Sequence, residues 1–409
     1  MAKKNVIDSN ASLFDIVSSL NSTAEIIDQS LYANIPDWIS TGSYILNAGL
    51  SGSLFGGCPA GRVLTFAGNP GSGKTFLALS ICREAQKKGY TPIYMDSEGS
   101  VDKAFVERLG IDTKNFIIMQ VNTISEVSTF ISNLLLKINK DQKIILVLDS
   151  LGNLTSDKEK DDIINATGKR DMSKQQEIKA LFRTNMVGLA KAHIPFIVNS
   201  HVYQTMDLFA KNIVSGGSGI AFNSSITMML SASKMDDKAS EDAMKKTGAE
   251  GTKVGVIVTA KPEKSRFCKP IKTKFYIPFY KSPNPYIGLE PYLTWENSGI
   301  VRGKLYNEKE YNKLKDSEKE QCKEFEFNGE KMYTLPKDTA RGIVVKHLGS
   351  EIPLVELFTP KVFTDELLHK LDDEVIKPIF QLPNVNEIDD LKEMESEIEF
   401  NNDTSEDLE

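Results

Sequence analysis

The sequence predicts an α/β fold in which helices cover both faces of a mostly parallel central sheet, followed by a small domain and an acidic tail. Three observations lead to this prediction. Short apolar runs alternate with helical periodicity from about residue 60 to 280. A glycine-rich loop separates one such run from a helix, and acidic residues crowd the C-terminal end. Strands and helices that alternate in this way build parallel sheets with both faces covered.

Seven apolar runs are the predicted strands of this sheet, at residues 63–67, 92–95, 116–119, 144–148, 195–198, 226–230 and 254–259. A helix is expected over 75–88, with Gly89 at the position of a C-terminal cap. Cys82 lies on the apolar face of this helix, so we expect it in the core and not as a reactive thiol.

Two further helices are predicted from their N-terminal signals. Thr123 and Glu126 have the spacing of a capping box, and Ser173 and Gln176 repeat this arrangement. Apolar residues follow each pair at helical spacing. Both helices are therefore expected to bury one face against the sheet.

Proline positions and changes in composition divide the chain into four regions. The segment 1–39 reads as mostly helical, and the prolines at 283, 285 and 291 end the periodic pattern. We expect a core over 40–289, a small mixed α/β domain over 290–385 and a disordered acidic tail over 386–409.

The composition is that of a globular protein with two or three domains. Of 409 residues, 40% are hydrophobic and 26% are charged. No apolar run approaches the roughly 18 residues of a membrane-spanning helix, and no signal peptide is readable, so a cytoplasmic location is expected. The four cysteines and four histidines match no zinc spacing, so we expect neither a structural metal nor disulfides.

The net charge of −7 hides an uneven distribution. Residues 386–409 hold eleven acidic side chains and one basic side chain, a charge of −10, so residues 1–385 carry +3. A block of like charge repels itself and stays solvated. This tail is either a solubility device or a polyanion mimic that competes with nucleic acid for a basic groove.

A phosphate-binding loop follows the strand at 63–67. The loop fits G-x-x-x-x-G-K-[ST] at every fixed position and consists of Gly68, Asn69, Pro70, Gly71, Ser72, Gly73, Lys74 and Thr75. Its glycines let backbone N–H groups converge on phosphate oxygens, and the helix that follows points its positive end at the same anion. We expect Lys74 to reach the β and γ phosphates of ATP or GTP, and the Thr75 hydroxyl to bind Mg²⁺.

Two carboxylates complete the predicted nucleotide site. The strand at 144–148 is wholly apolar and leads into Asp149, which is expected to hold Mg²⁺ through water. Glu98 follows the second strand, where it could orient and deprotonate the water that attacks the γ-phosphate. The alternative for Glu98 is an ordinary solvated acid of a loop.

Together these motifs resemble the RecA-type strand-exchange recombinases, and most closely the bacteriophage branch of that family. The resemblance covers about residues 40–280. It rests on the phosphate loop, on the stretch from Asp96 to Asp112, and on Asp-Ser-Leu-Gly-Asn-Leu at 149–154, which is especially phage-like. It implies a RecA-like ATPase core in which Phe105 stacks on adenine, although an aromatic at helical spacing is more often a core residue.

The resemblance also implies DNA-binding loops and a sensor of the γ-phosphate. His201 stands where bacterial recombinases have a glutamine that senses this phosphate, and the phage branch is similar to this chain in using histidine there. The family's first DNA-binding loop matches the polar stretch 157–171. The remaining implied DNA-binding residues are Arg183, Tyr203, Phe209, Lys211, Gly216, Gly217, Ser218 and Gly219. Alternatives are an ordinary exposed helix arginine for Arg183 and a lid without a nucleic-acid role for 203–222.

Lys264 and Arg266 resemble the residues with which one recombinase subunit reaches the ATP of its neighbour. Two positions apart on an extended chain, they could face the same phosphate in the manner of arginine fingers. Without the resemblance this segment would read as a solvated basic loop. The N-terminal contact that joins subunits is suspected at Leu13, Phe14 and Ile16.

The function implied by the resemblance is that of an ATP-dependent DNA recombinase, using ATP and Mg²⁺. Such a protein forms a homo-oligomeric helical filament on single-stranded DNA, pairs it with homologous duplex DNA and exchanges strands, aided by a recombination mediator and a single-strand-binding protein. If the chain is phage-encoded, it acts in the host cell cytoplasm. The alternatives are a RecA-like hexameric DNA helicase, a small-molecule kinase with a phosphate loop, and a DNA-coating protein without catalysis.

Overall fold

The computed structural model describes residues 12–30, 33–139, 141–164, 173–204, 212–215, 217–234, 255–278 and 283–383. The chain divides into two compact units. The first consists of Met1–Ile39 and Cys58–Met228, and the second of Ser40–Gly57 and Met229–Glu409. The predicted boundary at 39/40 coincides with the first break between the units, whereas the predicted boundary at 289/290 has no counterpart in this division. The predicted domain organisation stays a prediction. None of the described helices is both long enough and apolar enough to span a membrane.

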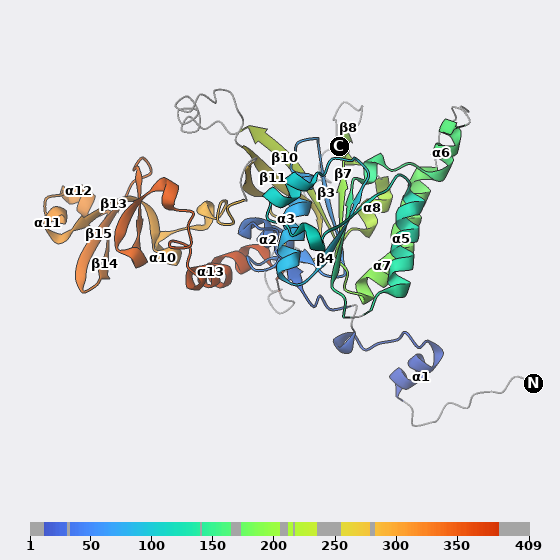
Figure 1. Cartoon of the computed structure of the whole chain (residues 1–409). Helices are drawn as coiled ribbons and strands as arrows, with labels where there is room; N and C mark the ends of the chain where they lie inside the picture. Colours follow the sequence, from blue (N-terminus) through green and yellow to red (C-terminus); the bar gives the residue numbers. More distant parts are fainter. Residues whose placement is uncertain are drawn as a thin grey trace, which may run out of the picture. The chain divides into compact units, whose positions relative to one another are not determined.

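The central sheet is mostly parallel, as predicted (Figure 1). In the first unit its strands follow the order β10-β3-β7-β6-β4-β5, and in the second unit β10 continues into the order β10-β11-β12. The pairs β3–β7, β7–β6, β6–β4 and β4–β5 are parallel, whereas β11–β12 is antiparallel. The strands are β3 (Val63–Gly68), β4 (Thr91–Asp96), β5 (Ile117–Gln120), β6 (Ile144–Asp149), β7 (Phe196–Ser200), β10 (Ile226–Lys234), β11 (Gly255–Ser265) and β12 (Thr273–Pro278). All seven predicted strands are confirmed, and β12 was not predicted.

Helices cover both faces of the sheet in the first unit (Figure 1). The helix α3 contacts β3, β4, β6 and β7, while residues of α5 and α7 share an apolar core with the opposite face. The helices of this unit are α1 (Leu13–Leu20), α3 (Lys74–Lys87), α4 (Lys103–Arg108), α5 (Ile124–Lys137), α6 (Asp157–Ile164), α7 (Ser173–Lys191) and α8 (Gly217–Asn223). Short 3₁₀ turns are η1 (Ile27–Gln29), η2 (Thr113–Asn115) and η3 (Leu151–Asn153), and short strands are β1 (Trp38–Ile39), β2 (Cys58–Pro59), β8 (Val202–Gln204) and β9 (Asn212–Val214).

Strand alternation decides which face each side chain occupies. Leu146 and Leu148 of β6, and Val198 of β7, belong to the core shared with α5 and α7. Because successive side chains of a strand point to opposite faces, Val147 and Asp149 point to the face that α3 covers. The polar residues at the strand ends therefore gather beside the start of α3.

The ends of the described helices can be compared with the predicted capping residues. Thr123 and Glu126 form a reciprocal capping box at the start of α5, and Gly89 follows α3 with a positive φ of 80°. Cys82 is buried, which confirms its place in the core, and burial raises the pKa of its thiol. The helix predicted to open with Ser173 is present as α7 (Ser173–Lys191), but its predicted capping box stays a prediction, because residues 165–172 before it lie outside the described residues.

The N-terminal segment is less helical than predicted. Among its described residues, only α1 and the three-residue turn η1 are helical, and 22–26 and 33–37 have no helix. No residue of α1 is buried. A short helix is stable in a protein when its apolar face packs against other residues. Apolar spacing without such packing was therefore not enough to make this segment helical.

The second unit contains α2 (Tyr44–Ser51) and a five-stranded sheet of order β14-β15-β13-β16-β17. Every pair in this sheet is antiparallel. Its strands are β13 (Ile300–Asn307), β14 (Lys323–Phe327), β15 (Glu330–Pro336), β16 (Gly342–Val345) and β17 (Ser350–Pro353). Its helical segments are η4 (Glu290–Tyr292), α10 (Trp295–Ser298), α11 (Glu308–Tyr311), α12 (Asp316–Lys319), η5 (Lys346–Leu348), η6 (Leu354–Glu356), α13 (Asp365–Leu371), the π-helical turn η7 (Asp372–Ile376) and α14 (Lys377–Phe380).

A buried carboxylate joins the two pieces of the second unit. Asp372 is 2% exposed and accepts hydrogen bonds from the Ser53 hydroxyl at 2.7 Å and the Leu54 backbone N–H at 2.6 Å. Lys377 lies 3.3 Å from the same carboxylate. The segment before the phosphate loop is thereby fixed by residues more than 300 positions later in the chain.

Candidate nucleotide-binding site

The loop between β3 and α3 has the backbone that a phosphate site requires. Gly71 and Gly73 have positive φ angles of 75° and 93°, where a side chain would be strained. Gly73 immediately precedes the first residue of α3, so the helix begins at the loop and directs its positive end there. The Ser72 hydroxyl is buried and has no hydrogen-bond partner among the described residues. These groups fit an anion held at the loop.

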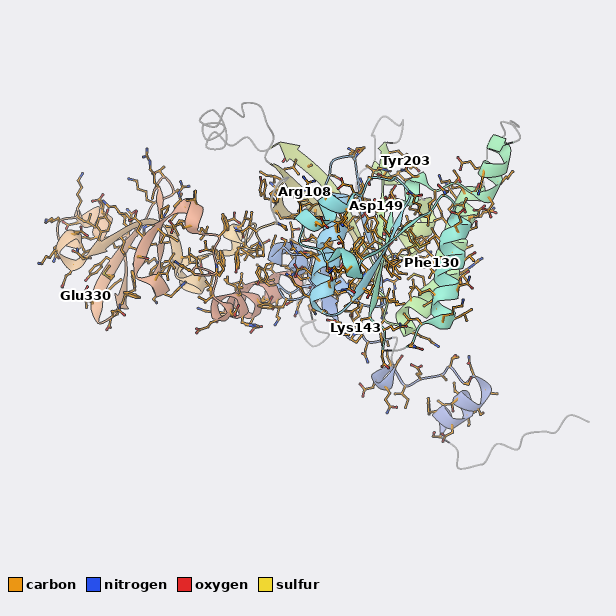
Figure 2. The ribbon with its side chains drawn as sticks, viewed as in Figure 1. Arg108, Phe130, Lys143, Asp149, Tyr203 and Glu330 are labelled. Carbon is orange, nitrogen blue, oxygen red and sulfur yellow. The ribbon has the colours of Figure 1, made fainter. Side chains whose placement is uncertain are left out.

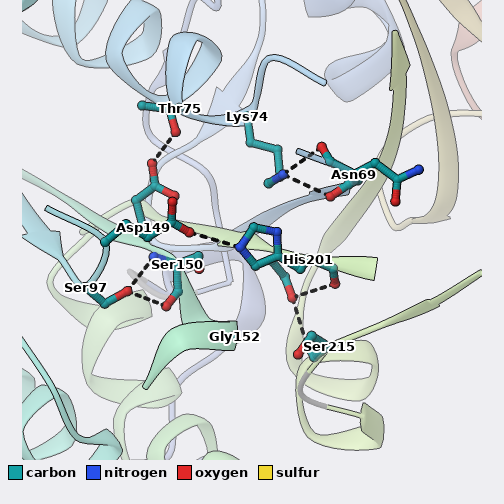
Figure 3. A network of polar contacts seen from close by, with 12 residues as sticks. Asn69, Lys74, Thr75, Ser97, Asp149, Ser150, Gly152, His201 and Ser215 are labelled. Atoms are coloured by element: carbon teal, nitrogen blue, oxygen red, sulfur yellow. Dashed lines mark hydrogen bonds and ion pairs between the residues drawn. The ribbon is translucent and has the colours of Figure 1, made fainter. Parts of the chain in front are cut away.

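Lys74 is held inside this loop. Its ammonium group donates to the main-chain oxygens of Gly68 at 2.9 Å and Asn69 at 3.1 Å (Figure 3). Burial lowers the pKa of Lys74, and the carboxylates of Asp149 and Glu98 act in the opposite direction. A phosphate group would offer this amine charged acceptors in place of the two carbonyl oxygens.

Asp149 is the second element of the site, at the end of β6. It is 1% exposed, and one of its oxygens, Oδ2, accepts a hydrogen bond from the Thr75 hydroxyl at 2.6 Å (Figure 3). The same oxygen accepts a second hydrogen bond from the Tyr94 hydroxyl, also at 2.6 Å. Burial and the adjacent carboxylate raise the pKa of Tyr94 far above its ordinary value, so Tyr94 stays a neutral donor. A carboxylate and a hydroxyl are the oxygen ligands that Mg²⁺ prefers, so Asp149 and Thr75 fit this metal.

Glu98 is the third element, and a neighbouring aspartate fixes its backbone. At the end of β4, the Asp96 carboxylate accepts from the backbone N–H groups of Glu98 at 2.9 Å and Gly99 at 2.8 Å. The Glu98 side chain then lies with its Oε1 3.0 Å from His201 Nε2. Both side chains are partly exposed, at 25% for Glu98 and 32% for His201. The predicted catalytic acid and the predicted sensor are thus in direct contact, although 103 residues separate them in the sequence.

His201 connects this pair to the segment after β7. Its carbonyl oxygen accepts from the Ser215 N–H at 2.7 Å, and the Ser200 hydroxyl donates to the Ser215 carbonyl at 2.7 Å. Gly152 lies beside both, because a Cβ placed on it would be 3.2 Å from the His201 ring and 3.4 Å from the Ser215 hydroxyl. Lys174 of α7 donates to the Gly152 carbonyl at 3.2 Å. A movement of His201 would therefore displace its neighbours in η3 and beside β9. Through Gly152 it would also shift the contact with α7.

The other predicted site residues lie around this centre. Tyr203 is 50% exposed on β8 (Figure 2), Arg183 is exposed on α7, and Phe105 is half-buried on α4. Gly219 is buried in α8, where an added Cβ would lie 3.1 Å from side chains of α7. Gly217 has a positive φ of 61° at the start of α8. The backbone of Ser218 is described as part of α8.

Some predicted residues are not placed at the centre. Phe209, Lys211, Gly216 and the tail 386–409 lie outside the described residues. Lys264 and Arg266 lie in the second unit. Lys264 is in β11, as the expected extended conformation requires, but β11 ends at Ser265 and Arg266 lies in the bend that follows. Burial lowers the pKa of Lys264, and the nearby Arg266 lowers it further.

Sequence reasoning missed several supporting residues. Tyr94, Asp96, Gly152 and Ser215 hold the predicted residues in place, but none was predicted to have this role. A signal existed for Asp96, because an aspartate at a strand end often binds the N–H groups that follow it. Tyr94 is two positions earlier and so shares its face. Gly152 lies within the stretch 149–154 that carries the family resemblance, but nothing local in the sequence marks its contact with His201. Nothing local marks Ser215.

A glycine-rich loop with a buried lysine, between a parallel strand and a helix and beside a buried carboxylate, defines the class of nucleotide-binding proteins with a phosphate loop. A family model described as "RecA N-terminal domain" matches residues 22–276, more than half of the chain. The chain therefore belongs to the RecA family. Members of this family use ATP with Mg²⁺.

Individual relatives agree with this assignment. The chain is 28% identical to the "Recombination and repair protein" of Enterobacteria phage T4 over 65% of its own length and 66% of that protein. It is 37% identical to "Protein RecA" of Wolbachia sp. subsp. Brugia malayi over 29% of its length and 32% of the relative, and 30% identical to "Protein RecA" of Bifidobacterium breve over 46% and 47%. In each comparison the chain spans less than two thirds of the relative's length.

Proposed function

We propose that this protein is an ATP-dependent DNA recombinase that forms filaments on single-stranded DNA and catalyses homologous pairing and strand exchange. The observation that carries the proposal is the 3.0 Å contact between Glu98 and His201. This contact joins Glu98, the proposed catalytic acid, to the chain segment that leads into β8 and β9. A helicase or a kinase shares the phosphate loop, but the family assignment favours the recombinase.

In the proposed reaction Glu98 takes a proton from water while the water oxygen bonds to the γ-phosphorus of ATP. The bond from this phosphorus to the bridging oxygen breaks, and ADP and phosphate leave. Lys74 and the loop N–H groups hold the phosphate oxygens, and Thr75 and Asp149 would hold Mg²⁺. When bound, Mg²⁺ neutralises charge that develops on the phosphates. The sensor, His201, changes its contact with Glu98 as the γ-phosphate is bound or lost.

The DNA-binding part of the proposal involves the segments that follow His201 and η3. Tyr203, Phe209, Lys211 and the glycine-rich stretch 216–219, with Arg183, would contact the strand by stacking and phosphate binding. An exposed aromatic ring such as Tyr203 offers a surface on which a base can stack. Phe105 would stack on the adenine of ATP.

Assembly is the third part of the proposal. Leu13 is 76% exposed and Phe14 41% exposed on α1, and Ile117 and Ile118 are each about half exposed on the edge strand β5. Apolar groups on a helix and on a sheet edge are surfaces through which copies of a chain associate. In a filament, Lys264 and Arg266 would reach the nucleotide of the next protomer. A recombination mediator, a single-strand-binding protein and the host cell cytoplasm belong to the same proposal.

ATP turnover measured with and without single-stranded DNA tests the proposal. We expect the DNA to accelerate turnover, and the same preparation to exchange strands between a single-stranded circle and a homologous duplex. Electron microscopy on single-stranded DNA should show helical filaments. Turnover at the same rate with and without DNA would exclude the recombinase, and closed rings would favour the helicase.

A further inference from the structure

Asn199, the fourth residue of β7, is a buried polar residue that the proposed reaction does not use. Its exposed fraction is 0%. Neither its Nδ2 nor its Oδ1 has a hydrogen-bond partner among the described residues. A buried amide without partners destabilises a fold, because it loses its bonds to water and gains none.

The strand register places Asn199 beside Asp149. β6 and β7 are parallel, and Leu148 pairs with Val198, so the next residues on the two strands, Asp149 and Asn199, are neighbours. Adjacent strands lie about 4.8 Å apart. Val198 points to the core shared with α5 and α7, so Asn199 points to the face covered by α3, as Asp149 does.

The Asp149 carboxylate has a free acceptor on this face. Thr75 and Tyr94 both donate to Oδ2. Among the described residues, no hydrogen bond to Oδ1 is present. An asparagine supplies two donors and one acceptor, so it can bind both a carboxylate oxygen and a water molecule.

We infer that Asn199 is a positioning residue for the Mg²⁺ that Asp149 and Thr75 would hold. Its amide binds the second oxygen of Asp149 and the water held there once metal and nucleotide are present. Mg²⁺ keeps several waters when it binds to proteins, and groups that orient its ligands affect the affinity for the metal. This role rests on the proposed nucleotide site.

The test is the Mg²⁺ concentration for half-maximal binding of a fluorescent, non-hydrolysable ATP analogue to the full chain. We expect Asn199→Val to raise this concentration about tenfold, the lower end of the effect of such supporting groups on metal affinity. Binding of the analogue in EDTA should be unchanged. Asn199→Thr has the shape of the valine variant but keeps a hydroxyl, so it should recover part of the loss.

Melting of the metal-free and nucleotide-free protein supplies a second readout. Asn199→Val removes an amide without partners, so its melting temperature should equal or exceed that of the unmodified chain. A matched control is Thr227→Val on β10, which likewise removes a buried polar group without a described partner, here a hydroxyl, but is separated from β6 by two strands. It should leave the Mg²⁺ dependence unchanged.

An unchanged Mg²⁺ dependence for Asn199→Val would overturn the role, as would an equal loss of binding in EDTA. If Asn199→Val fails to fold, the comparison of Asn199→Thr with the unmodified chain decides, and an unshifted value overturns the role. If the unmodified chain shows no Mg²⁺-dependent binding, the proposed nucleotide site itself is wrong.

Discussion

Replacing Gly152 with alanine should weaken the response of ATP turnover to DNA. The new Cβ would lie 3.2 Å from the His201 ring and 3.4 Å from the Ser215 hydroxyl. Carbon atoms in contact prefer about 3.5–4.0 Å, so the ring must move by about 0.3 Å or more. The contact between His201 and Glu98 is now 3.0 Å, and a shift of this size bends or lengthens it toward the limit of a hydrogen bond.

The expected size of the effect follows from that contact. A hydrogen bond to a charged group contributes about 1.5–3 kcal/mol, and losing half of it costs about 1 kcal/mol. Because 1.36 kcal/mol corresponds to a tenfold change in rate, we expect the ratio of turnover with and without single-stranded DNA to fall about fivefold.

Steady-state ATP hydrolysis with increasing single-stranded DNA measures this ratio. Gly188→Ala is the matched control, because its Cβ would meet the flexible end of Leu135 in α5 and no residue of the site. We expect it to lower stability without changing the ratio. A Gly152→Ala protein with the ratio of the unmodified chain would refute the idea that His201 carries the signal.

Four further predictions concern the site and the tail. Lys74→Ala should reduce ATP turnover at least about a hundredfold, because the charged group at the phosphates is lost, and turnover near that of the unmodified chain would contradict the site. Glu98→Gln should abolish hydrolysis but keep binding of nucleotide and DNA in filter-binding assays, whereas a DNA-coating protein would behave as before. Tyr94→Phe should lower the free energy of unfolding by about 1–3 kcal/mol in urea titrations, because the buried Asp149 loses a donor; an unchanged midpoint would mean that water replaces the hydroxyl. Removing 386–409 should strengthen duplex binding and change its salt dependence, and identical titrations at several salt concentrations would leave the tail as a solubility device.

The parts of the fold that the sequence predicts are those with a strong local signal. The wholly apolar strands of the parallel sheet and the phosphate loop are recognisable because burial on both faces and tight turns restrict the choice of residue. β12 was missed because its alternation ends in Tyr276, Ile277 and Pro278, which breaks the period of two. The described part of 1–39 is less helical than predicted, because apolar spacing does not indicate whether other residues pack against the helix.

The individual residues of the site could be predicted from the sequence, but the contacts between them could not. Lys74, Thr75 and Asp149 are close together, as their motifs imply. The contact of Glu98 with His201, the donor role of Tyr94 and the burial of Asn199 depend on strand order and register. Those properties arise from pairing between distant segments, which no local pattern encodes.

The bonds from Ser53 and Leu54 to Asp372 have a consequence for synthesis on the ribosome. Residues 40–57 leave the exit tunnel early, but their acceptor is made only after more than 300 further residues. Until translation is nearly complete, the Ser53 hydroxyl and the Leu54 N–H can bond to water but not to Asp372. A fragment ending near residue 290 would lack that acceptor, so a stable shortened version of this protein must keep the later helices.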